Sequence, residues 1–278
     1  MLHIPSFETA YVYLHATEAW LNQQPVKNIG IIAQCRQLIA QQLPNSEAAF
    51  ANLLFNNNII ATAAKPGPKI ILSASEPNIK GINLLANYFN QLPVNPVGIM
   101  AETTLAKAFI NEYFKSVKRT RIIYLQQLSV LQNIPMPQGQ MKIADIADLD
   151  CVLTMNTGFF DSVDLFPIKP KSQIEQETIS LIKAKKVFLW MLDKTPRCMA
   201  AIIRENQYVN FIGHVFTPLE YRNNGFAYGV MHALCKHILD SGISYCGLFT
   251  DYGNPISNHI YKKLGFEVLD EYSDIELM

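Results

Sequence analysis

The sequence lacks the features that mark membrane, secreted and nucleic-acid-binding proteins. No apolar run approaches the ~18 residues of a membrane span. Residues 1–5, Met-Leu-His-Ile-Pro, contain no basic region followed by an apolar stretch, as a signal peptide would. Lys and Arg number 23, as do Asp and Glu, so no charge excess points to nucleic acid or to a strongly acidic partner. These absences predict a soluble cytoplasmic protein that binds neither nucleic acid nor membrane.

Paired cysteines are missing as well. The five cysteines are odd in number and scattered, and no Cys-x-x-Cys pair occurs. Neither a zinc site nor a disulfide framework is therefore indicated. Reduced thiols in a cytosolic protein without a metal are the expectation.

The first half of the chain contains no aspartate. Residues 1–138 carry ten Lys/Arg and six Glu (10 − 6 = +4), whereas residues 139–278 carry thirteen Lys/Arg and seventeen Asp/Glu (13 − 17 = −4). A chain of 278 residues, 49% hydrophobic, can bury one large core or two ordinary ones. Residues 131–140 hold two prolines and a glycine and predict a linker. We therefore predict two domains, residues 1–135 and 136–278.

Hydrophobic periodicity predicts the same order of elements in both halves. In the first half we expect helices and strands at Thr9–Leu21, Val26–Gln41, Ile59–Ala64, Lys69–Ser73, Ile82–Phe89, Val97–Ala101, Thr103–Val117 and Arg121–Leu128. In the second half we expect them at Ile146–Phe160, Ser172–Lys185, Val187–Leu192, Cys198–Arg204, Tyr208–Thr217, Gly225–Ser241, Tyr245–Thr250, Pro255–Leu264 and Phe266–Glu276. Each half runs helices, strands, helix, strand, helix, strand, which indicates a repeated α/β architecture.

One turn in the second half has the composition of a phosphate site. Residues 222–227, Arg-Asn-Asn-Gly-Phe-Ala, connect a predicted strand to the long helix. The first N–H groups of a helix have no intrahelical partner and suit a diphosphate. Gly225 allows close backbone approach, Ala227 is small, and Arg222 adds a permanent positive charge. An ordinary strand-to-helix turn with a conformational glycine would contain the same residues.

A second motif follows at Asn254. Asn254 before Pro255 is the arrangement of an N-cap followed by a proline at the first helical position. Ser257 and Tyr261 then lie on one helical face. A phenol with a pKa of about 10 can protonate a departing thiolate. The alternative role for Tyr261 is that of a half-buried aromatic packing the helix to a sheet.

The order of the two motifs resembles the GCN5-related N-acetyltransferase (GNAT) superfamily. Residues 222–227 match its pyrophosphate signature, Arg/Gln-x-x-Gly-x-Gly/Ala, and residues 254–266 match its later Asn-x-x-Ala/Ser pattern ending in Tyr-x-Lys-x-Gly-Phe. The segments Phe-Thr-Pro-Leu-Glu-Tyr-Arg at residues 216–222 and Leu-Phe-Thr-Asp at residues 248–251, followed by Asn254-Pro255, are similar to those of a branch of bacterial predicted acetyltransferases. In that branch a divergent N-terminal half precedes the catalytic one. The resemblance implies an α/β (α+β) fold with a mixed central sheet flanked by helices, preceded by a degenerate GNAT-like half.

The resemblance also implies the site. The pantetheine arm of acetyl-CoA would pair with the backbone of Val215, Phe216 and Thr217. The diphosphate would lie on Arg222, Asn223, Asn224, Gly225, Phe226 and Ala227, with Asn254 and Ser257 also in the cofactor-binding set. A backbone N–H would polarise the thioester carbonyl, and Tyr261 would protonate the thiolate.

The general base is the least defined position. His214 adjoins the thioester-binding strand and titrates in a useful range, so it is the candidate that we favour. A strand histidine that only packs, or that faces solvent, is the alternative. Glu220, beside the phosphate turn, is a second candidate base.

The predicted activity is transfer of an acetyl group from acetyl-CoA to a primary amine by direct attack in a ternary complex. A glycine N-acyltransferase-like enzyme using a longer acyl-CoA is one alternative, and a non-catalytic acyl-CoA-binding or sensing protein is another. The acceptor amine and the oligomeric state stay open. The first half is expected to be structural or to close one wall of the acceptor site.

Overall fold

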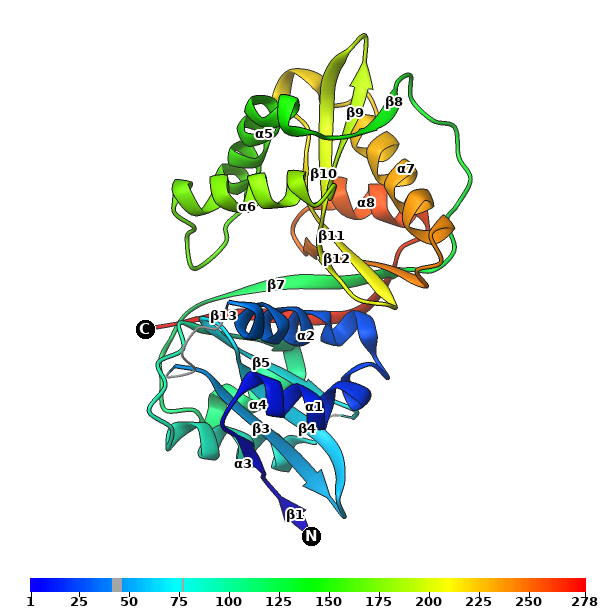
Figure 1. The fold of residues 1–278 in the computed structure, drawn as a ribbon. Helices are drawn as coiled ribbons and strands as arrows, with labels where there is room; N and C mark the ends of the chain where they lie inside the picture. The colour runs from blue at the N-terminus through cyan, green and yellow to red at the C-terminus, as the bar shows by residue number, and fades with distance from the viewer. Residues whose placement is uncertain (42–46, 77) are drawn as a thin grey trace. The chain divides into compact units, whose positions relative to one another are not determined.

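The computed structural model describes residues 1–41, 47–76 and 78–278, which form two compact units. Unit 1 comprises Met1–Leu125 and Leu269–Met278, and unit 2 comprises Gln126–Val268. The chain passes from one unit to the other within β7 and again within β13, the last strand (Figure 1). Whether residues 1–135 and 136–278 behave as separate domains stays a prediction.

Unit 1 is a mixed sheet with helices on both faces. Its elements are β1 (Leu2–His3), β2 (Ser6–Phe7), α1 (Ala10–Leu21), α2 (Pro25–Ala40), β3 (Ala49–Phe55), β4 (Asn58–Lys65), β5 (Lys69–Ala74), α3 (Ile79–Asn90), β6 (Gly98–Glu102), α4 (Thr103–Glu112), β7 (Val117–Leu128) and β13 (Glu267–Leu277). The strands lie in the order β1-β3-β4-β5-β6-β13-β7, with β2 beside β3. Strands β5 and β6 are parallel, and β13 runs antiparallel to β6.

Alternation along the strands of unit 1 separates two cores. Ala51 and Leu53 face α3 and α4, whereas Phe50 faces α1 and α2. This period of two is the normal alternation of a β-strand, and here both faces are buried. Because a strand buried on both faces carries no polar alternation, the sequence did not indicate β3, and the structure adds it.

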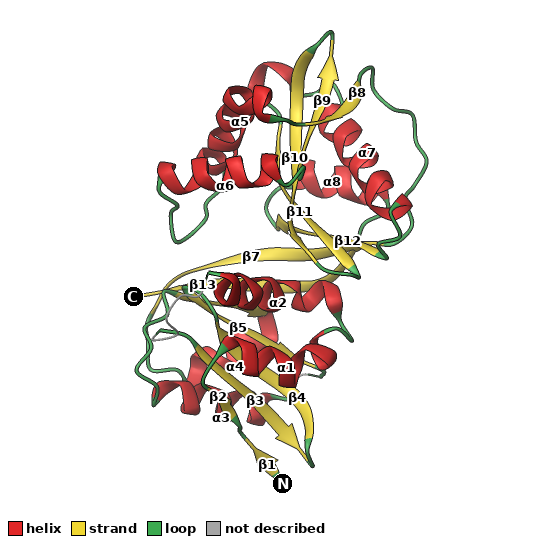
Figure 2. Ribbon diagram, in the orientation of Figure 1, coloured by secondary structure: helices red, strands yellow, loops and turns green. Residues whose placement is uncertain are grey.

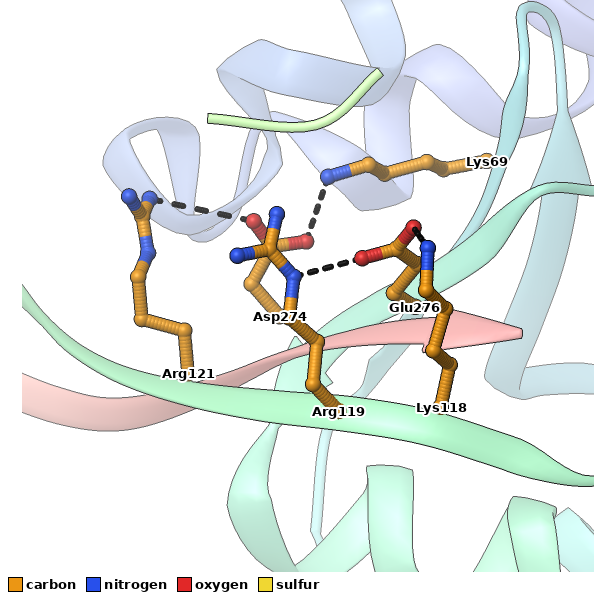
Figure 3. A network of polar contacts seen from close by, with 6 residues as sticks. All are labelled: Lys69, Lys118, Arg119, Arg121, Asp274 and Glu276. Atoms are coloured by element: carbon orange, nitrogen blue, oxygen red, sulfur yellow. Dashed lines mark hydrogen bonds and ion pairs between the residues drawn. The ribbon is translucent and has the colours of Figure 1, made fainter. Parts of the chain in front are cut away.

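Ion pairs attach the C-terminal strand to unit 1 (Figure 3). Asp274 on β13, only 3% exposed, accepts a 2.5 Å hydrogen bond from Lys69 Nζ on β5, and Arg121 on β7 lies 3.7 Å from its other oxygen. Glu276 pairs with Lys118 at 2.8 Å and also with Arg119. A strand more than two hundred residues away from β5 in sequence is thereby held in the sheet that contains β5.

Unit 2 repeats the element order of unit 1. It contains β8 (Gln140–Ile143), the short 3₁₀ helix η1 (Ile146–Asp148), α5 (Leu149–Ser162), α6 (Lys171–Lys183), β9 (Val187–Leu192), β10 (Thr195–Glu205), β11 (Val209–Phe216), the 3₁₀ helix η2 (Leu219–Tyr221), α7 (Phe226–Asp240), β12 (Tyr245–Asp251) and α8 (Pro255–Leu264). The strands lie in the order β12-β11-β10-β9-β8, with β9, β10 and β11 antiparallel and β12 parallel to β11 (Figure 2).

Helices cover both faces of the unit 2 sheet. The α7 and α8 face packs against Cys198, Ala200 and Ile212, and the α5 and α6 face packs against Met199 and Ala201. The predicted fold class is confirmed: a mixed sheet flanked by helices, in a chain whose two units follow the same order of elements.

Two predicted elements differ from the structure. The helix predicted at Thr103–Val117 ends at Glu112, and β7 begins at Val117, four residues before the predicted strand Arg121–Leu128. Residues 113–116 separate the two elements, and β7 pairs with β13 in the sheet. The predicted linker at residues 131–140 lies within unit 2, where Gln132 N–H donates to Leu264 O at 2.9 Å and Trp190 Nε1 donates to Gln138 O at 3.0 Å.

Two general expectations can be compared with the described residues only. Over residues 1–41, 47–76 and 78–278, no helix combines the length and the hydropathy that a membrane crossing requires. Within the same ranges, no three His, Cys, Asp or Glu side chains gather as metal ligands would.

Candidate functional site

Strands β11 and β12 separate before either of them ends. Their parallel pairing runs from Val209 opposite Tyr245 to Ile212 opposite Leu248. β11 then continues to Phe216 and β12 to Asp251, with no further pairing between them. The backbone of residues 213–216 on the β12 side therefore presents an open edge, to which an extended ligand can add as a strand does.

A bulge at His214 marks the start of this open edge. Met199 is opposite Phe216 and Ala201 is opposite Gly213, so two residues of β11 stand against one of β10. His214 adopts φ +52°, in the left-handed region that a bulge residue can occupy. The bulge redirects the backbone next to the residues that the resemblance assigns to thioester binding.

The His214 ring is enclosed between two aromatic rings of α5. Its centroid lies 5.1 Å from those of Phe159 and Phe160, and the residue is 9% exposed. Burial, with smaller effects from the charges of Lys169 and Arg204, lowers the pKa of His214 to about 3. Nδ1 is buried and has no hydrogen-bond partner among the described residues. The imidazole is thus neutral, with one nitrogen available to a ligand.

The side chains at the end of β11 pack in alternation. Val215 lies against the α7 and α8 core, and Phe216 lies against the α5 side, where a Cβ added to Gly158 would come within 2.6 Å of the Phe216 ring. Thr217 Oγ1 donates to Cys198 Sγ at 3.1 Å. These contacts fix the strand end while leaving its backbone edge toward β12 unpaired.

The turn predicted to bind phosphate is held by its own polar groups. Arg222 Nε donates to Thr217 O at 3.1 Å, and Asn224 Nδ2 donates to Tyr221 O and Arg222 O at 3.2 and 3.0 Å. Asn223 has φ +65°, and Gly225, the N-cap of α7, has φ +77°. A side chain other than glycine at position 225 would be strained.

Six consecutive N–H groups in this turn have no acceptor. In the part of the chain that the structure describes, the N–H groups of residues 223–228 donate to no carbonyl or side chain, and the next one, Gly229 N–H, donates to Gly225 O at 2.9 Å. Unpaired N–H groups at the start of a 15-residue helix form a ready anion site. Arg222, Asn223, Asn224, Gly225, Phe226 and Ala227 thus lie where a diphosphate would be expected to bind.

Helix α8 has the bounds that its sequence signals predict. Asn254 Oδ1 accepts from Ser257 N–H at 3.1 Å, Pro255 is the first helical residue, and Gly265 at φ +104° ends the helix. Asn254 and Ser257 are therefore joined at the helix start, on the exposed end of the motif. The roles of these two residues toward a cofactor stay predictions.

A buried hydrogen-bond network anchors the same helix. Gln126 Nε2 donates to Thr250 Oγ1 at 2.8 Å and to Asn258 Oδ1 at 3.1 Å, and Thr250 Oγ1 donates to Asn258 Oδ1 at 2.7 Å. Asn258 lies three residues before Tyr261 on α8. The network fixes α8 to β12 and was not indicated by either sequence motif.

Tyr261 has a buried ring. The residue is 7% exposed, and its ring lies 5.7 Å from that of Phe266 in an edge-to-face arrangement. Burial, with a smaller effect of the Cys198 and Cys235 thiols, raises its pKa. The hydroxyl has no hydrogen-bond partner among the described residues. Tyr261 is therefore a protonated phenol with its hydrogen-bonding capacity unused.

Two arginines, not one, lie at the phosphate turn. Arg197 of β10 has its guanidinium 4.3 Å from the ring centroid of Tyr221, the residue before Arg222. Sequence motifs could not indicate this contact, since Arg197 precedes the turn by more than twenty residues. Glu220, the second candidate base, is exposed in η2.

Comparison with known proteins agrees with this geometry. Residues 190–274 match the family model of FR47-like protein. Solved structures share the fold along nearly the whole chain at low sequence identity, and no curated relative matches. An acetyltransferase of the GNAT family from Colwellia psychrerythraea is 14% identical, with 99% of this chain and 100% of that chain covered and a TM-score of 0.60.

Two further structures extend the likeness. A GCN5-related N-acetyltransferase from Sphaerobacter thermophilus is 14% identical, with 99% of this chain and 95% of that chain covered and a TM-score of 0.61. A tandem GNAT protein from the clavulanic acid biosynthesis pathway is 9% identical, with 100% and 98% covered and a TM-score of 0.51. The fold is that of the GNAT proteins, and together with the family match it confirms the resemblance to the GNAT superfamily.

Proposed function

We propose that the protein is an N-acetyltransferase that moves an acetyl group from acetyl-CoA to a primary amine. The open edge of β11 beside six unpaired N–H groups is the observation that carries the proposal. Pantetheine, which has two amide groups, suits an unpaired strand edge, and a diphosphate suits a helix start flanked by arginine. The likeness in fold to GNAT acetyltransferases supports acyl transfer from an acyl-CoA in general.

The proposed reaction is a direct attack in a ternary complex. The acceptor nitrogen forms a bond to the thioester carbonyl carbon, and the carbon–sulfur bond breaks. An unpaired N–H of residues 215–217 would stabilise the negative charge that develops on the carbonyl oxygen. The leaving thiolate takes a proton from the Tyr261 hydroxyl, and the proton that the nitrogen loses passes to a base. Holding amine and thioester in line supplies much of the rate.

His214 is the base that we propose, acting after attack. A pKa of about 3 makes His214 a poor acceptor for a proton from a free ammonium group. Attack on the carbonyl lowers the pKa of the nitrogen, so its proton passes to a neutral imidazole more readily from the tetrahedral intermediate than from a free ammonium group. The acceptor therefore enters as the free amine, or loses its first proton to water. Glu220, exposed and outside the aromatic enclosure, is the alternative base.

Replacement of Tyr261 by Phe tests the proposal. The variant should bind acetyl-CoA with nearly unchanged affinity, because the buried ring and its packing are kept, while kcat for amine acetylation falls about a hundredfold or more. Calorimetric titration measures the affinity for acetyl-CoA, and CoA release in the presence of a panel of amines measures kcat.

Tyr272→Phe is the matched control. Tyr272 is likewise buried but belongs to unit 1, so the loss of its hydroxyl should leave kcat unchanged. Wild-type turnover by Tyr261→Phe would refute the acid role. Binding of acetyl-CoA without turnover of any amine would instead favour a sensing protein. Comparing acetyl-CoA with a longer acyl-CoA decides whether the donor carries a larger acyl group.

A further inference from the structure

Arg197 lies next to the phosphate turn but belongs to a different strand. Met199 of β10 is opposite Phe216, the last residue of β11, so Arg197 extends beyond the end of β11 toward the residues that follow it. A register shift between Pro196 and Cys198 in the β9–β10 pairing accompanies this position. The guanidinium stacks on Tyr221 at 4.3 Å, directly before Arg222.

The charge of Arg197 has no carboxylate partner. Within the described residues Arg197 forms no ion pair, and its Nε atom is buried without a hydrogen-bond partner. Two other partly buried cations of unit 2 are paired, Lys142 with Asp148 and Lys186 with Glu205, both at 2.7 Å, whereas Arg204 lies over the Phe211 ring. The buried Nε–H of Arg197 therefore lacks an acceptor, which an anionic ligand could supply.

The surroundings of Arg197 favour an anion further. Arg222 uses its Nε on Thr217 O and leaves its other N–H groups available, and the N–H groups of residues 223–228 are unpaired. Glu220 is the carboxylate of this turn, and it is exposed and forms no ion pair within the described chain. The stack on Tyr221 also holds the guanidinium plane in one orientation, as bidentate contact with phosphate requires.

We propose that Arg197 is a second phosphate-binding residue of the donor site, contacting phosphoryl oxygens of the nucleotide part of the acyl donor. The inference rests on the proposed function, since it assumes a CoA-type donor. The diphosphate and the 3′-phosphate of CoA offer the same chemistry. A flat, stacked guanidinium suits either one better than the point charge of lysine does.

Three ligands and four proteins test the proposal by calorimetric titration. The ligands are CoA, 3′-dephospho-CoA and pantetheine, which carry both phosphate groups, the diphosphate alone, and none. The proteins are the wild type, Arg197→Met, Arg197→Lys and Arg204→Met. Arg204 is the matched control, because it also lies on β10 with its guanidinium over an aromatic ring, that of Phe211 at 5.6 Å, but near the other end of the strand.

Arg197→Met should bind CoA about tenfold to a hundredfold more weakly, with Arg197→Lys in between and Arg204→Met unchanged. An equal loss for dephospho-CoA would assign the contact to the diphosphate, and a loss for CoA alone would assign it to the 3′-phosphate. Pantetheine affinity should not change in any variant. Unchanged CoA affinity in Arg197→Met, or an equal loss for pantetheine, would overturn the proposal. Absence of CoA binding to the wild type would overturn the proposed function itself.

Discussion

Burial sets opposite protonation behaviour in the two candidate catalytic residues. It raises the pKa of Tyr261, so the phenol holds its proton, and it lowers the pKa of His214 to about 3, so the imidazole is neutral. A proton donor and a proton acceptor are thereby kept in the forms that acid and base catalysis need at neutral pH. Both groups lack hydrogen-bond partners among the described residues, as expected of groups that contact a substrate.

The low pKa of His214 also predicts how stability depends on pH. The pKa of histidine in an unfolded chain is near 6.5, whereas the pKa of folded His214 is about 3. Between these two pH values the unfolded chain binds a proton that the folded protein does not bind. The neutral buried His214 therefore contributes fully to the free energy of unfolding above pH 7. This contribution decreases as the pH falls through this window, and on the order of 3 kcal/mol is lost at pH 4. Urea unfolding of unit 2, followed by tryptophan fluorescence between pH 7 and pH 4, measures it.

His214→Asn should remove this part of the pH dependence, and His259→Gln, at an exposed position on α8, should keep it. The same slope in His214→Asn as in the wild type would contradict the neutral buried state. Because the His214 pKa is about 3, an acid limb near pH 6.5 in kcat/KM that disappears in His214→Asn would also contradict the account.

At the residue scale, the sequence indicates those site residues that lie within one short motif. Arg222, Gly225 and Tyr261 are recognisable because the chemistry needs them at fixed spacing in a turn or on a helix. Arg197 and Asn258 could not be found in that way. Arg197 reaches the turn through strand pairing, and Asn258 acquires its role from Gln126 and Thr250.

At the element scale, the start of α7 depends on a backbone conformation that glycine tolerates and other residues do not. Gly225 adopts φ +77°, and an added Cβ would have room, with its nearest neighbour, Pro137 Cβ, at 3.6 Å. A substitution would therefore act through the backbone and not through a clash. A shifted backbone would move the unpaired N–H groups that follow.

Gly225→Ala should destabilise the protein by about 1 kcal/mol and weaken donor binding as well. Gly242→Ala is its counterpart, since Gly242 follows α7 with φ +90° and has nothing within 4 Å of an added Cβ. It should cost a similar amount of stability and leave donor affinity unchanged. Thermal unfolding and calorimetric titration of both variants separate the two effects. Equal donor affinity in both would show that the turn does not bind the donor through its backbone.

Local signals decided which elements could be predicted. Helix α8 was predicted with its observed bounds, Pro255–Leu264, because an N-cap, a first-turn proline and a terminal glycine all lie within the segment itself. Strand β3, Ala49–Phe55, is alanine-rich and buried on both faces. Its sequence therefore shows neither the apolar–polar alternation of a half-buried strand nor the 3.6-residue period of an amphipathic helix. The length of α4 was overestimated because tertiary pairing of β7, not propensity, ends that helix.

At the scale of the whole molecule, the last ten residues of the chain are part of unit 1, which also contains the first. Ile275 and Leu277 are buried in the core beside α3 and α4, and Asp274 pairs with Lys69 and Arg121 (Figure 3). Desolvation, partly offset by Asp274, lowers the pKa of Lys69. Unit 1 therefore cannot complete its sheet without residues 269–278.

Asp274→Asn should destabilise unit 1 by about 3 to 5 kcal/mol, because it leaves two cations of a buried cluster without their shared carboxylate. Asp240→Asn breaks an exposed Lys–Asp pair in unit 2, in which both side chains are more than 60% exposed, and should cost less than about 1 kcal/mol. Chemical unfolding of the two variants measures the difference. Losses of equal size would contradict the structural role of the cluster.

The two units share an order of elements but differ at the helix that follows the central strands. In unit 2, α7 begins at a glycine turn with unpaired N–H groups. In unit 1, α3 begins at Asn78, whose side chain accepts from Gly81 N–H at 2.9 Å and so uses one of the corresponding groups. We therefore expect a single donor site, in unit 2.

Calorimetric titration of the intact protein with acetyl-CoA tests the central claim most directly. We predict binding of one acetyl-CoA per chain in the range of typical substrate affinities, about 1 μM to 1 mM, with weaker binding at high salt because the turn recognises phosphate. Absence of binding to acetyl-CoA, to free CoA and to a longer acyl-CoA would contradict the account and remove the basis for an acyltransferase.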